Sequence, residues 1–468
     1  MTATEALDKG HGDRGGSPLV APCTPPRRRA LTVGLVTVVT LVAFEALAVS
    51  TILPSVRDDL GGVRLYGWTF SAFMLMSLIG IVWAGRESDR TGPGRPFLAG
   101  GVLFGVGLVI AGLAPSMWVL VLGRAIQGLG GGVVPAVAYV AIGRSYSEDE
   151  RPRMFALLAT AWVVPGLIGP GIAAAIASVW GWRAVFLVLV PVLAFAIALT
   201  APVLFRLGSP ATSSGTPQSL QRALQLVVGA GLLLTGLTLP SFTVGLPLTI
   251  AGVALSVPAA RALTPRGTLS GAPGLPAAIL GMALLTFAFF GADAFIPFAL
   301  TEVRGTSTFF VGAVLTVSTL AWTAGSWTLE RTRTRFGPFR PMLVGLAVLT
   351  IGTVAMAGTI VTEVHLAAAL VAWSVGGYGI GLAYPSFSLA VLSRAKPGAE
   401  GATSSSLKLM EAFGSALGAG LAGAIVSAGE SSGHERLALG LTFALMAAAV
   451  VAAMGSASRI GGESVLTD

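Results

Sequence analysis

Five ionisable residues stand inside long apolar stretches of the sequence: Glu45, Arg124, Asp293, Lys408 and Glu411. An ionisable group at the centre of a membrane helix costs about 2.5–3.5 kcal/mol even on insertion scales, so such residues mark ion pathways or binding sites. A carboxylate that alternates between an arginine, which favours its ionised form, and apolar surroundings, which favour its protonated form, loads and releases a proton. These residues therefore predict proton transfer and the binding of a charged small molecule.

Glu45 and Arg124 are predicted to pair, because they lie at similar depths in their apolar stretches. At a rise of 1.5 Å per residue, they lie roughly 15 Å and roughly 10 Å from the outer ends of those stretches. We hypothesise that Glu45 is the main proton carrier and that Arg124 gates it. The alternative is a static ion pair that only joins two helices. Gln127, one turn after Arg124, is a candidate polar contact for a substrate or for Glu45.

Aromatic residues surround Asp293 in the sequence. Phe290 and Phe295 flank it closely, and Phe289 and Phe298 lie just beyond. A carboxylate among aromatic rings suits a cationic amphiphile, through charge and cation–π attraction. Asp293 is therefore a candidate for substrate binding, together with Phe290 and Phe295, and equally for a second proton site. The remaining alternative is a carboxyl group that is hydrogen-bonded within the helix bundle.

Lys408 and Glu411 are three positions apart on one apolar stretch, so on a helix they share a face. The simpler interpretation is a structural pair in which the two charges neutralise each other. The alternative is that both residues take part in substrate binding.

The composition shows what kind of protein must position these groups. Charged residues are 11% of the 468 residues, against about 25% in a soluble globular protein, and hydrophobic residues reach 54%. A disordered chain is excluded, because such chains are poor in apolar residues. The net charge of +8 comes from short basic clusters between apolar runs, so no nucleic-acid partner is expected. One cysteine and three histidines offer no disulfide framework and little material for a metal site.

Apolar runs long enough to cross a bilayer of about 30 Å follow one another along the chain. Because backbone groups in lipid must be satisfied internally, these runs are predicted to be helices. With the N-terminus inside, inner segments hold 22 of the 29 basic residues and outer segments five, which predicts that both termini are cytoplasmic. The fourteen predicted spans are 31–55, 68–85, 96–114, 117–141, 154–178, 183–205, 223–240, 244–262, 275–300, 308–329, 341–361, 365–393, 402–428 and 436–457.

The second half of the chain repeats features of the first at a nearly constant displacement. The segment 169–176 aligns with 418–425, 92–96 aligns with 337–341, and Glu45 aligns with Asp293. Parallel repeats are a secondary-transporter architecture with the substrate site between the halves. The predicted fold is all-α and polytopic, with two pseudo-symmetric six-helix bundles and a two-helix central insertion. The predicted units are a disordered cytoplasmic tail 1–29, an N-terminal bundle 30–206, a cytoplasmic linker 207–222, an inserted hairpin 223–263, a C-terminal bundle 264–457 and a cytoplasmic tail 458–468.

Three motifs carry a resemblance to a known family. The loop from Gly85 to Arg95 has the pattern Gly-x-x-x-Asp-Arg-x-Gly-x-x-Arg, which resembles the signature loop of the major facilitator superfamily. The segment 124–128 is similar to that superfamily's Arg-x-x-Gln-Gly motif. Gly166, Gly169 and Pro170 resemble its antiporter motif, although the closing Gly-Gly of that motif is Ala-Ala here. With fourteen spans, the chain resembles the 14-helix drug:proton antiporter family over roughly residues 30–455. That family usually has an Asp where this chain has Glu45.

The signature loop has a physical interpretation of its own. Gly85 and Gly92 permit close approach and a tight turn, and Asp89 can accept from arginine or lie at a helix N-terminus. The resemblance implies that Asp89 and Arg90, with Gly85, Gly92 and Arg95, form a cytoplasmic latch between the bundles. The alternative is a positively flanked turn that only sets the topology.

The expected function is that of a proton-coupled exporter of amphiphilic or cationic small molecules in the cytoplasmic membrane, acting as a monomer among lipids. No nucleotide loop, metal cluster or catalytic set is apparent, so an enzyme is not expected, and no cofactor beyond the proton gradient. The alternatives are a dedicated exporter of a lipid, metabolite or natural product, a symporter on the same fold, or a non-transporting membrane sensor.

Overall fold

A computed structural model describes residues 25–60, 68–208, 220–239, 242–306, 308–336, 339–360 and 364–460, and within them it contains helices and no strand. A short helix α10 (Ile296–Phe298) and a π-helical turn (Ala299–Val303) follow α9. The long helices are α1 (Pro25–Leu60), α2 (Trp68–Thr91), α3 (Gly94–Gly112), α4 (Met117–Ser145), α5 (Arg151–Trp180), α6 (Trp182–Phe205), α7 (Leu220–Thr238), α8 (Phe242–Leu263), α9 (Leu275–Asp293), α11 (Thr308–Phe336), α12 (Phe339–Gly358), α13 (Ala367–Ser393), α14 (Glu400–Ser431) and α15 (Glu435–Ser458).

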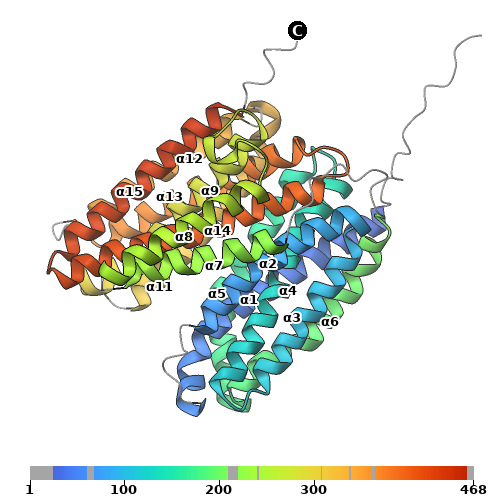
Figure 1. The fold of residues 1–468 in the computed structure, drawn as a ribbon, viewed down its shortest axis with the longest axis horizontal. Coiled ribbons are helices and arrows are strands. Elements are labelled where there is room, and N and C mark those ends of the chain that lie inside the picture. The colour runs from blue at the N-terminus through green and yellow to red at the C-terminus, as the bar shows by residue number, and fades with distance from the viewer. Residues whose placement is uncertain are drawn as a thin grey trace, which may run out of the picture.

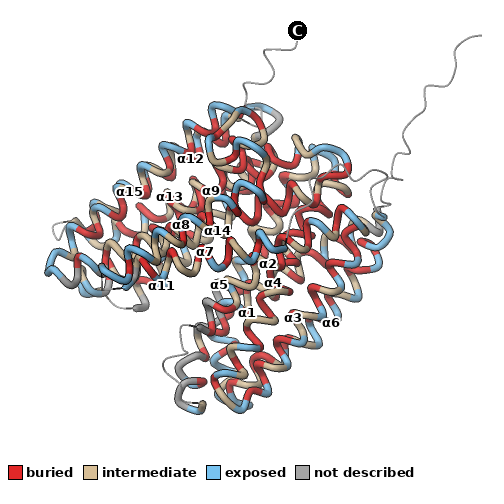
Figure 2. Tube along the Cα trace, viewed as in Figure 1, coloured by how far each residue is buried: buried red, intermediate tan, exposed pale blue. Residues whose placement is uncertain are grey.

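The helices form two bundles that meet at one end of the molecule and diverge toward the other (Figure 1). Helices α1 to α6 pack together in one bundle, and α9 with α11 to α15 pack together in the other. Buried residues fill the interior of each bundle, whereas the outward faces are exposed and largely apolar (Figure 2). We call the end where the bundles meet the inner end, since it carries the α2–α3 turn that the sequence places in the cytoplasm.

Glycines with a positive φ lie in turns between consecutive helices. Gly92 has φ 82° between α2 and α3, and Gly181 has φ 81° between α5 and α6. A side chain would be strained in this left-handed region, which glycine reaches at little cost. The sequence prediction of a tight turn at Gly92 therefore agrees with its backbone conformation.

Helices α7 and α8 form a tightly packed hairpin. A Cβ at Gly236 would lie 2.6 Å from the carbonyl oxygen of Gly245, and one at Gly252 would meet the backbone of Leu233. Small residues allow membrane helices to approach this closely. Helix α7 also contacts α2 and α14, so the hairpin touches both bundles; Figure 1 shows α7 between these two helices.

One end of a predicted unit differs in the structure. Helix α1 begins at Pro25, so residues 25–29, which were expected to be disordered, are helical. The reason is that proline is tolerated in the first turn of a helix, where its missing N–H would have no partner. Residues 1–24, most of the predicted linker (209–219) and residues 461–468 lie outside the described parts of the chain.

The span count of fourteen stays a prediction. Over the described residues, twelve helices are long and apolar enough to cross a membrane. A thirteenth, α5, qualifies when the halves Arg151–Gly166 and Gly171–Trp180, bent by 47°, count as one span. Helix α2 is not among them, and four charged residues lie near its inner end: Arg86, Glu87, Asp89 and Arg90.

Replacing Gly132 with alanine is expected to destabilise the protein by about 1–3 kcal/mol, the usual cost of overpacking. A Cβ at this position on α4 would meet the carbonyl oxygen of Ser77 on α2, and backbone cannot rotate away. Gly143, on the same helix, is the matched control, because its Cβ would find Leu392 Cδ2 at an ordinary 3.5 Å. Thermal unfolding in detergent should separate the two variants, and equal stability would contradict this packing.

Candidate functional site

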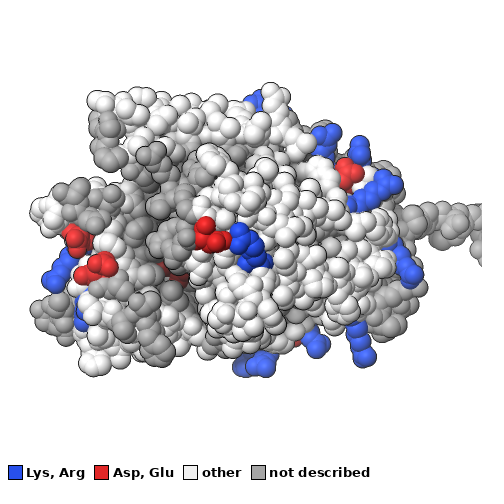
Figure 3. Space-filling view, turned by 90° about the horizontal axis from the view of Figure 1, so that it is seen from below, with Lys and Arg blue, Asp and Glu red and all other residues white. Residues whose placement is uncertain are grey.

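A cavity of about 620 Å³ lies between the two bundles. Its lining comes from α1, α2, α4 and α5 on one side and from α9, α11, α13 and α14 on the other, and it is mostly apolar. Of the residues that the structure describes, three charged ones line it: Asp293, Lys408 and Glu411. Figure 3 shows the surface hollowed between the bundles, with lysine and arginine gathered toward the inner end on the right. The cavity is the place where both halves of the repeat could hold one ligand.

Asp293 lies in the cavity wall at the end of α9, held by an aromatic cluster. Its Oδ1 accepts a hydrogen bond of 2.8 Å from Trp373 Nε1. The Trp373 ring stacks on Phe289, with centroids 5.1 Å apart, and Phe289 meets Trp322 edge-on at 5.2 Å. Among the described residues Asp293 has no basic partner, so a negative charge here faces the cavity without a counter-ion.

Lys408 and Glu411 belong to a network that joins the two bundles. Lys408 Nζ donates to Glu411 Oε2 and to the Tyr384 hydroxyl, both at 2.8 Å. It also lies 3.9 Å from the ring centroid of Tyr139, which is on α4 of the other bundle. The Tyr139 hydroxyl donates to that of Tyr384 at 3.1 Å. The predicted pair therefore exists, and it contacts two tyrosines that the sequence did not single out: Tyr384 of the same bundle and Tyr139 of the other.

Glu45 and Arg124 form a buried ion pair beside the cavity. The side chains are 1% and 3% exposed, and Arg124 Nη1 donates to Glu45 Oε1. The guanidinium also donates to Gln127 Oε1 at 2.7 Å and to the Thr69 carbonyl at 3.0 Å. Its Cζ lies 4.5 Å from the ring centroid of Phe73, which itself lines the cavity. The pair therefore contacts the cavity wall without lining the cavity.

Asp89 joins the bundles at the inner end. Its two carboxylate oxygens each accept a 2.7 Å hydrogen bond, from the N–H groups of Gly401 and Ala402. These amides lie in the first turn of α14, where backbone donors have no intrahelical partner and the helix dipole favours an anion. Arg144 of α4 lies 3.5 Å from Asp89 and 3.2 Å from Glu400. A carboxylate of one bundle thus caps a helix of the other.

Glycine lets α2 and α14 approach closely enough for this cap. A Cβ at Gly85 would meet Ser405, and one at Gly401 would meet the Gly85 carbonyl oxygen. Ser405 Oγ also donates to the Ile81 carbonyl at 2.8 Å across the interface. The predicted role of Gly85 in close helix approach agrees with this geometry.

Other residues expected in the latch lie elsewhere. Arg90 is exposed and its ion pair, at 3.3 Å, is with Glu87 on the same helix. Arg95 is exposed at the start of α3. Among the described residues, the basic group that lies within ion-pair distance of Asp89 is Arg144, at the inner end of α4. Sequence reasoning had no reason to choose Arg144, because its partners are distant in the chain.

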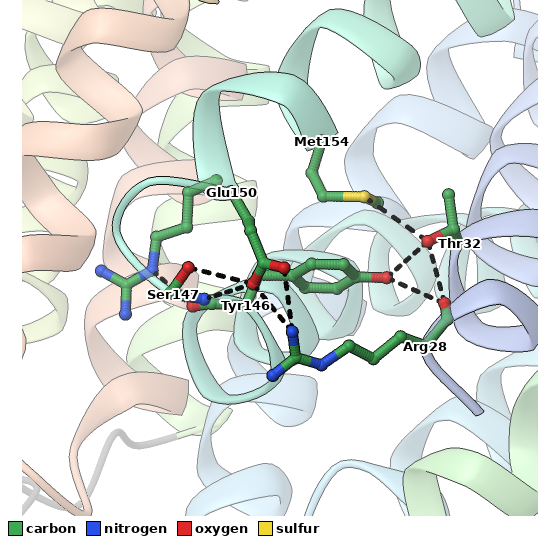
Figure 4. A network of polar contacts seen from close by, with 7 residues as sticks. Arg28, Thr32, Tyr146, Ser147, Glu150 and Met154 are labelled. Carbon is green, nitrogen blue, oxygen red and sulfur yellow. Dashed lines mark hydrogen bonds and ion pairs between the residues drawn. The ribbon is translucent and has the colours of Figure 1, made fainter. Parts of the chain in front are cut away.

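The loop after Arg144 is fixed by a polar network at the inner end (Figure 4). Arg28 Nη1 donates to both carboxylate oxygens of Glu150, at 2.8 and 3.1 Å, and the backbone N–H of Ser147 donates to Glu150 at 3.0 Å. The bond from Ser147, followed by Arg28, keeps the pKa of Glu150 below its ordinary value. The Tyr146 hydroxyl bonds Thr32 at 2.8 Å. These bonds tie the start of α1 to the α4–α5 loop.

The remaining candidate residues are spread over the molecule. Phe290 lines the cavity, whereas Phe295 is outside its lining and packs near Gly423 of α14. Gln127 is buried on Arg124 rather than exposed to the cavity. In α5, Gly169 packs near Phe44 of α1 and Gly166 lies in open space. The side chain of Pro170 is outside the described part of the structure.

The cap at Asp89 predicts a pH-dependent inner contact. Burial raises the pKa of Asp89 to about 6 from 3.8, against the opposing effect of the Ala402 and Gly401 amides. Because the pKa of Asp89 is higher in the closed form than in free solvent, protonation of Asp89 favours the closed form. The stabilisation of the closed form is largest below about pH 4 and is lost as the pH rises through about 6. The distance between spin labels at Arg86 and Lys396 should be longer on average at pH 7 than at pH 5, because fewer molecules are closed at the inner end. The variant Asp89→Asn should remove most of that difference; if the pH dependence survives unchanged, Asp89 is not its source.

Comparisons with known proteins agree with this arrangement. The family profile described as Major Facilitator Superfamily matches residues 33–419. A probable multidrug-efflux transporter of Mycobacterium tuberculosis is 27% identical over 448 residues, covering 90% of this chain and 93% of the relative. The multidrug transporter protein MdtP of Bacillus subtilis is 22% identical over 417 residues, covering 86% of this chain and 76% of the relative.

Solved structures show the same fold at low identity. The human organic anion transporter MFSD10 superposes with a TM-score of 0.69 at 14% identity, covering 93% of this chain and all of that one. The proton:xylose symporter XylE gives a TM-score of 0.63 at 14% identity, covering 92% and 94%. The predicted all-helical fold of the superfamily is thereby confirmed.

Proposed function

The chain belongs to the Major Facilitator Superfamily, and from this we propose that it is a proton-coupled exporter of amphiphilic or cationic small molecules. It is a multi-pass membrane transporter rather than an enzyme, as its family and relatives are. The proposal adds the substrate class, the direction, the proton coupling, fourteen spans, cytoplasmic termini and a place in the cytoplasmic membrane. The observation that carries it is the carboxylate of Asp293, which has no basic partner among the described residues and lies in an aromatic wall of the central cavity.

The cavity matches an amphiphilic cation in both charge and surface. Asp293 offers a negative charge without a basic neighbour among the described residues, and the rings of Phe290 and Trp322 lie in the same wall. A cation over an aromatic ring gains about 0.5–2 kcal/mol. Most of the remaining lining is apolar and suits the body of such a molecule. The relatives, named as a probable multidrug-efflux transporter and a multidrug transporter protein, support a small-molecule substrate.

Proton coupling is proposed for the carboxylates that change surroundings as the bundles rock. Glu45 is paired with Arg124 in the inner-closed arrangement and is shielded from water. Both residues lie in the same bundle, so their separation requires α1 to shift against α4 as the bundles rock; the carboxylate is then left among apolar groups and takes up a proton. Asp293 then exchanges its proton for the substrate cation, or binds the cation alone.

Alternating access would require the inner contact to break. In the structure Asp89 caps α14 and closes the inner end, while the bundles diverge at the other end (Figure 1). The opposite arrangement would release the α14 cap and close the outer end. A monomer that contains both bundles is sufficient for this cycle, with lipid around its apolar flanks.

Substrate-dependent proton flux in liposomes tests the proposal. Wild-type protein should move protons when a cationic amphiphile such as tetraphenylphosphonium is added on one side, and Asp293→Asn should reduce this flux at least about tenfold, as expected when 1.4 kcal/mol or more of binding is lost. The control is Asp59→Asn, which should leave the flux unchanged, because Asp59 is an exposed carboxylate at the other end of the N-terminal bundle. Absence of flux for every amphiphile tested would favour a dedicated exporter or a symporter instead.

A further inference from the structure

The two bundles face each other along two lines of helix contact, which we call seams, and the seams differ in structure. On one side α2 faces α14, and on the other α5 faces α11. At the α2–α14 seam, the inner half is closed by the Gly85–Gly401 approach and by the Ser405–Ile81 hydrogen bond. Farther out, α7 contacts both helices, so the hairpin covers this seam.

The contact of α7 with α14 reaches the outer half of the seam. A Cβ at Gly420 of α14 would meet Leu234 of α7. Gly420 lies about 30 Å along α14 from its inner start, at 1.5 Å per residue. The hairpin therefore lies against α14 well beyond the inner contact, where the bundles diverge.

The α5–α11 seam has no such cover among the described helices. Its inner half is held by Trp327 Nε1, which donates to Thr160 Oγ1 at 2.9 Å, and by Thr323, which lies 3.5 Å from the Ala159 carbonyl. Only a turn or two farther out, the helices part around a second pocket of about 170 Å³. Within the described part of the chain, the pocket is lined by residues of these two helices: Trp162, Val163, Gly166, Leu315, Thr316, Thr319 and Leu320.

This pocket adjoins the central cavity, and side chains of its lining are exposed on the flank of the molecule. Three residues, Trp162, Leu315 and Thr319, line both spaces. On the outside, Trp162 is 44% exposed and Leu320 is 40% exposed. An apolar cavity of about 150 Å³ is large enough to bind benzene, so the pocket admits an aromatic ring or an alkyl segment. Its surroundings would be lipid, because α5 and α11 present apolar flanks there.

We propose that the pocket between α5 and α11 is a lateral portal through which amphiphilic substrates pass between the central cavity and the surrounding bilayer. The inference rests on the proposed function, since it concerns the route of the same substrates. The hairpin α7–α8 makes the route one-sided, because it covers the other seam. The portal favours molecules that partition into lipid, whereas water-soluble ones use the open end of the cavity.

Transport of two phosphonium ions with the same head group tests the portal. Methyltriphenylphosphonium stays mainly in water, and decyltriphenylphosphonium partitions into the bilayer. Thr316→Trp fills the pocket, and Val317→Trp, on the lipid-facing side of α11 and outside the pocket lining, is the matched control. The measurement is initial uptake of each labelled ion into proteoliposomes, corrected with protein-free liposomes.

Thr316→Trp should slow uptake of the decyl ion about fivefold or more, the penalty of passing an overpacked contact, and should change methyl uptake less than about twofold. Thr316→Leu introduces a smaller side chain and should slow uptake of the decyl ion by an intermediate amount, again more than that of the methyl ion. Val317→Trp should change the uptake of neither ion. Equal losses for both ions, or no loss for either, overturn the portal while wild-type transport still supports the proposed function. If wild-type protein transports neither ion, the proposed function fails for this substrate class, and the portal fails with it.

Discussion

Replacing Glu45 with glutamine is expected to abolish substrate-driven proton flux and to lower the stability of the protein by about 3–5 kcal/mol. The stability loss arises because Arg124, 3% exposed, keeps its charge in the bundle without a counter-ion. Removing that charge as well, in Glu45→Gln/Arg124→Gln, should restore most of the stability. Proton flux should remain absent, because the proton carrier is still missing. Thermal unfolding and proton flux in liposomes measure the two effects separately.

The double variant distinguishes the two interpretations of this pair. If Glu45 and Arg124 only hold helices together, restoring stability should also restore proton-coupled transport. Such a result would remove the carrier role from Glu45. Asp59 and Arg183 provide a matched control, since they also join α1 to a neighbouring helix but are 48% and 41% exposed. Their double neutralisation should leave both stability and flux close to wild type, because solvent screens an exposed pair.

Replacing Asp89 with alanine is expected to open the inner end. The substitution removes both acceptors of the α14 amides, and an unsatisfied buried donor costs about 1–3 kcal/mol. A change of that size shifts the ratio of closed to open forms roughly 5–150-fold. Distances between spin labels at Arg86 and Lys396, both exposed at the inner end, should lengthen accordingly in a background where Cys23 is replaced by serine.

Two arginines test which basic residue holds the inner contact closed: Arg144, which lies beside Asp89 in the structure, or Arg90, which the family resemblance places in the latch. Arg144→Ala should lengthen the same distance, because Arg144 bridges Asp89 and Glu400 at 3.5 and 3.2 Å. Arg90→Ala should change it much less, because the ion pair of Arg90 stays on α2. A larger effect from Arg90 than from Arg144 would contradict the latch geometry described above.

Local sequence features predicted much of the fold. Apolar length and the distribution of basic residues indicated a helical membrane protein, and the signature loop indicated the superfamily that the profile match confirms. Depth along the helices brought Glu45 and Arg124 to the same level, and the structure shows them in contact. Of the two aromatic neighbours of Asp293 that were predicted to bind substrate, Phe290 lines the cavity and Phe295 does not.

Local sequence features did not predict contacts between residues that are far apart in the chain. Trp373, which bonds Asp293, lies 80 positions away, and Tyr139, which covers Lys408, lies in the other half of the chain. A tyrosine hydroxyl inside an apolar run was the one available signal for Tyr139 and Tyr384, since a buried hydroxyl needs a hydrogen-bond partner. Nothing in the local pattern identified which partner it would be.

The sequence by itself predicted which segments are apolar enough to lie in lipid and which charges stand within them, because transfer from water to the bilayer depends on the composition of each helix. The tertiary structure decided which helices are neighbours and what each charge contacts. It placed Arg144 on Asp89, left Asp293 facing the cavity, and put the α7–α8 hairpin over one seam and not the other. Those choices depend on the fit between helix surfaces from opposite ends of the chain, where single glycines such as Gly85 and Gly401 set how closely two backbones approach.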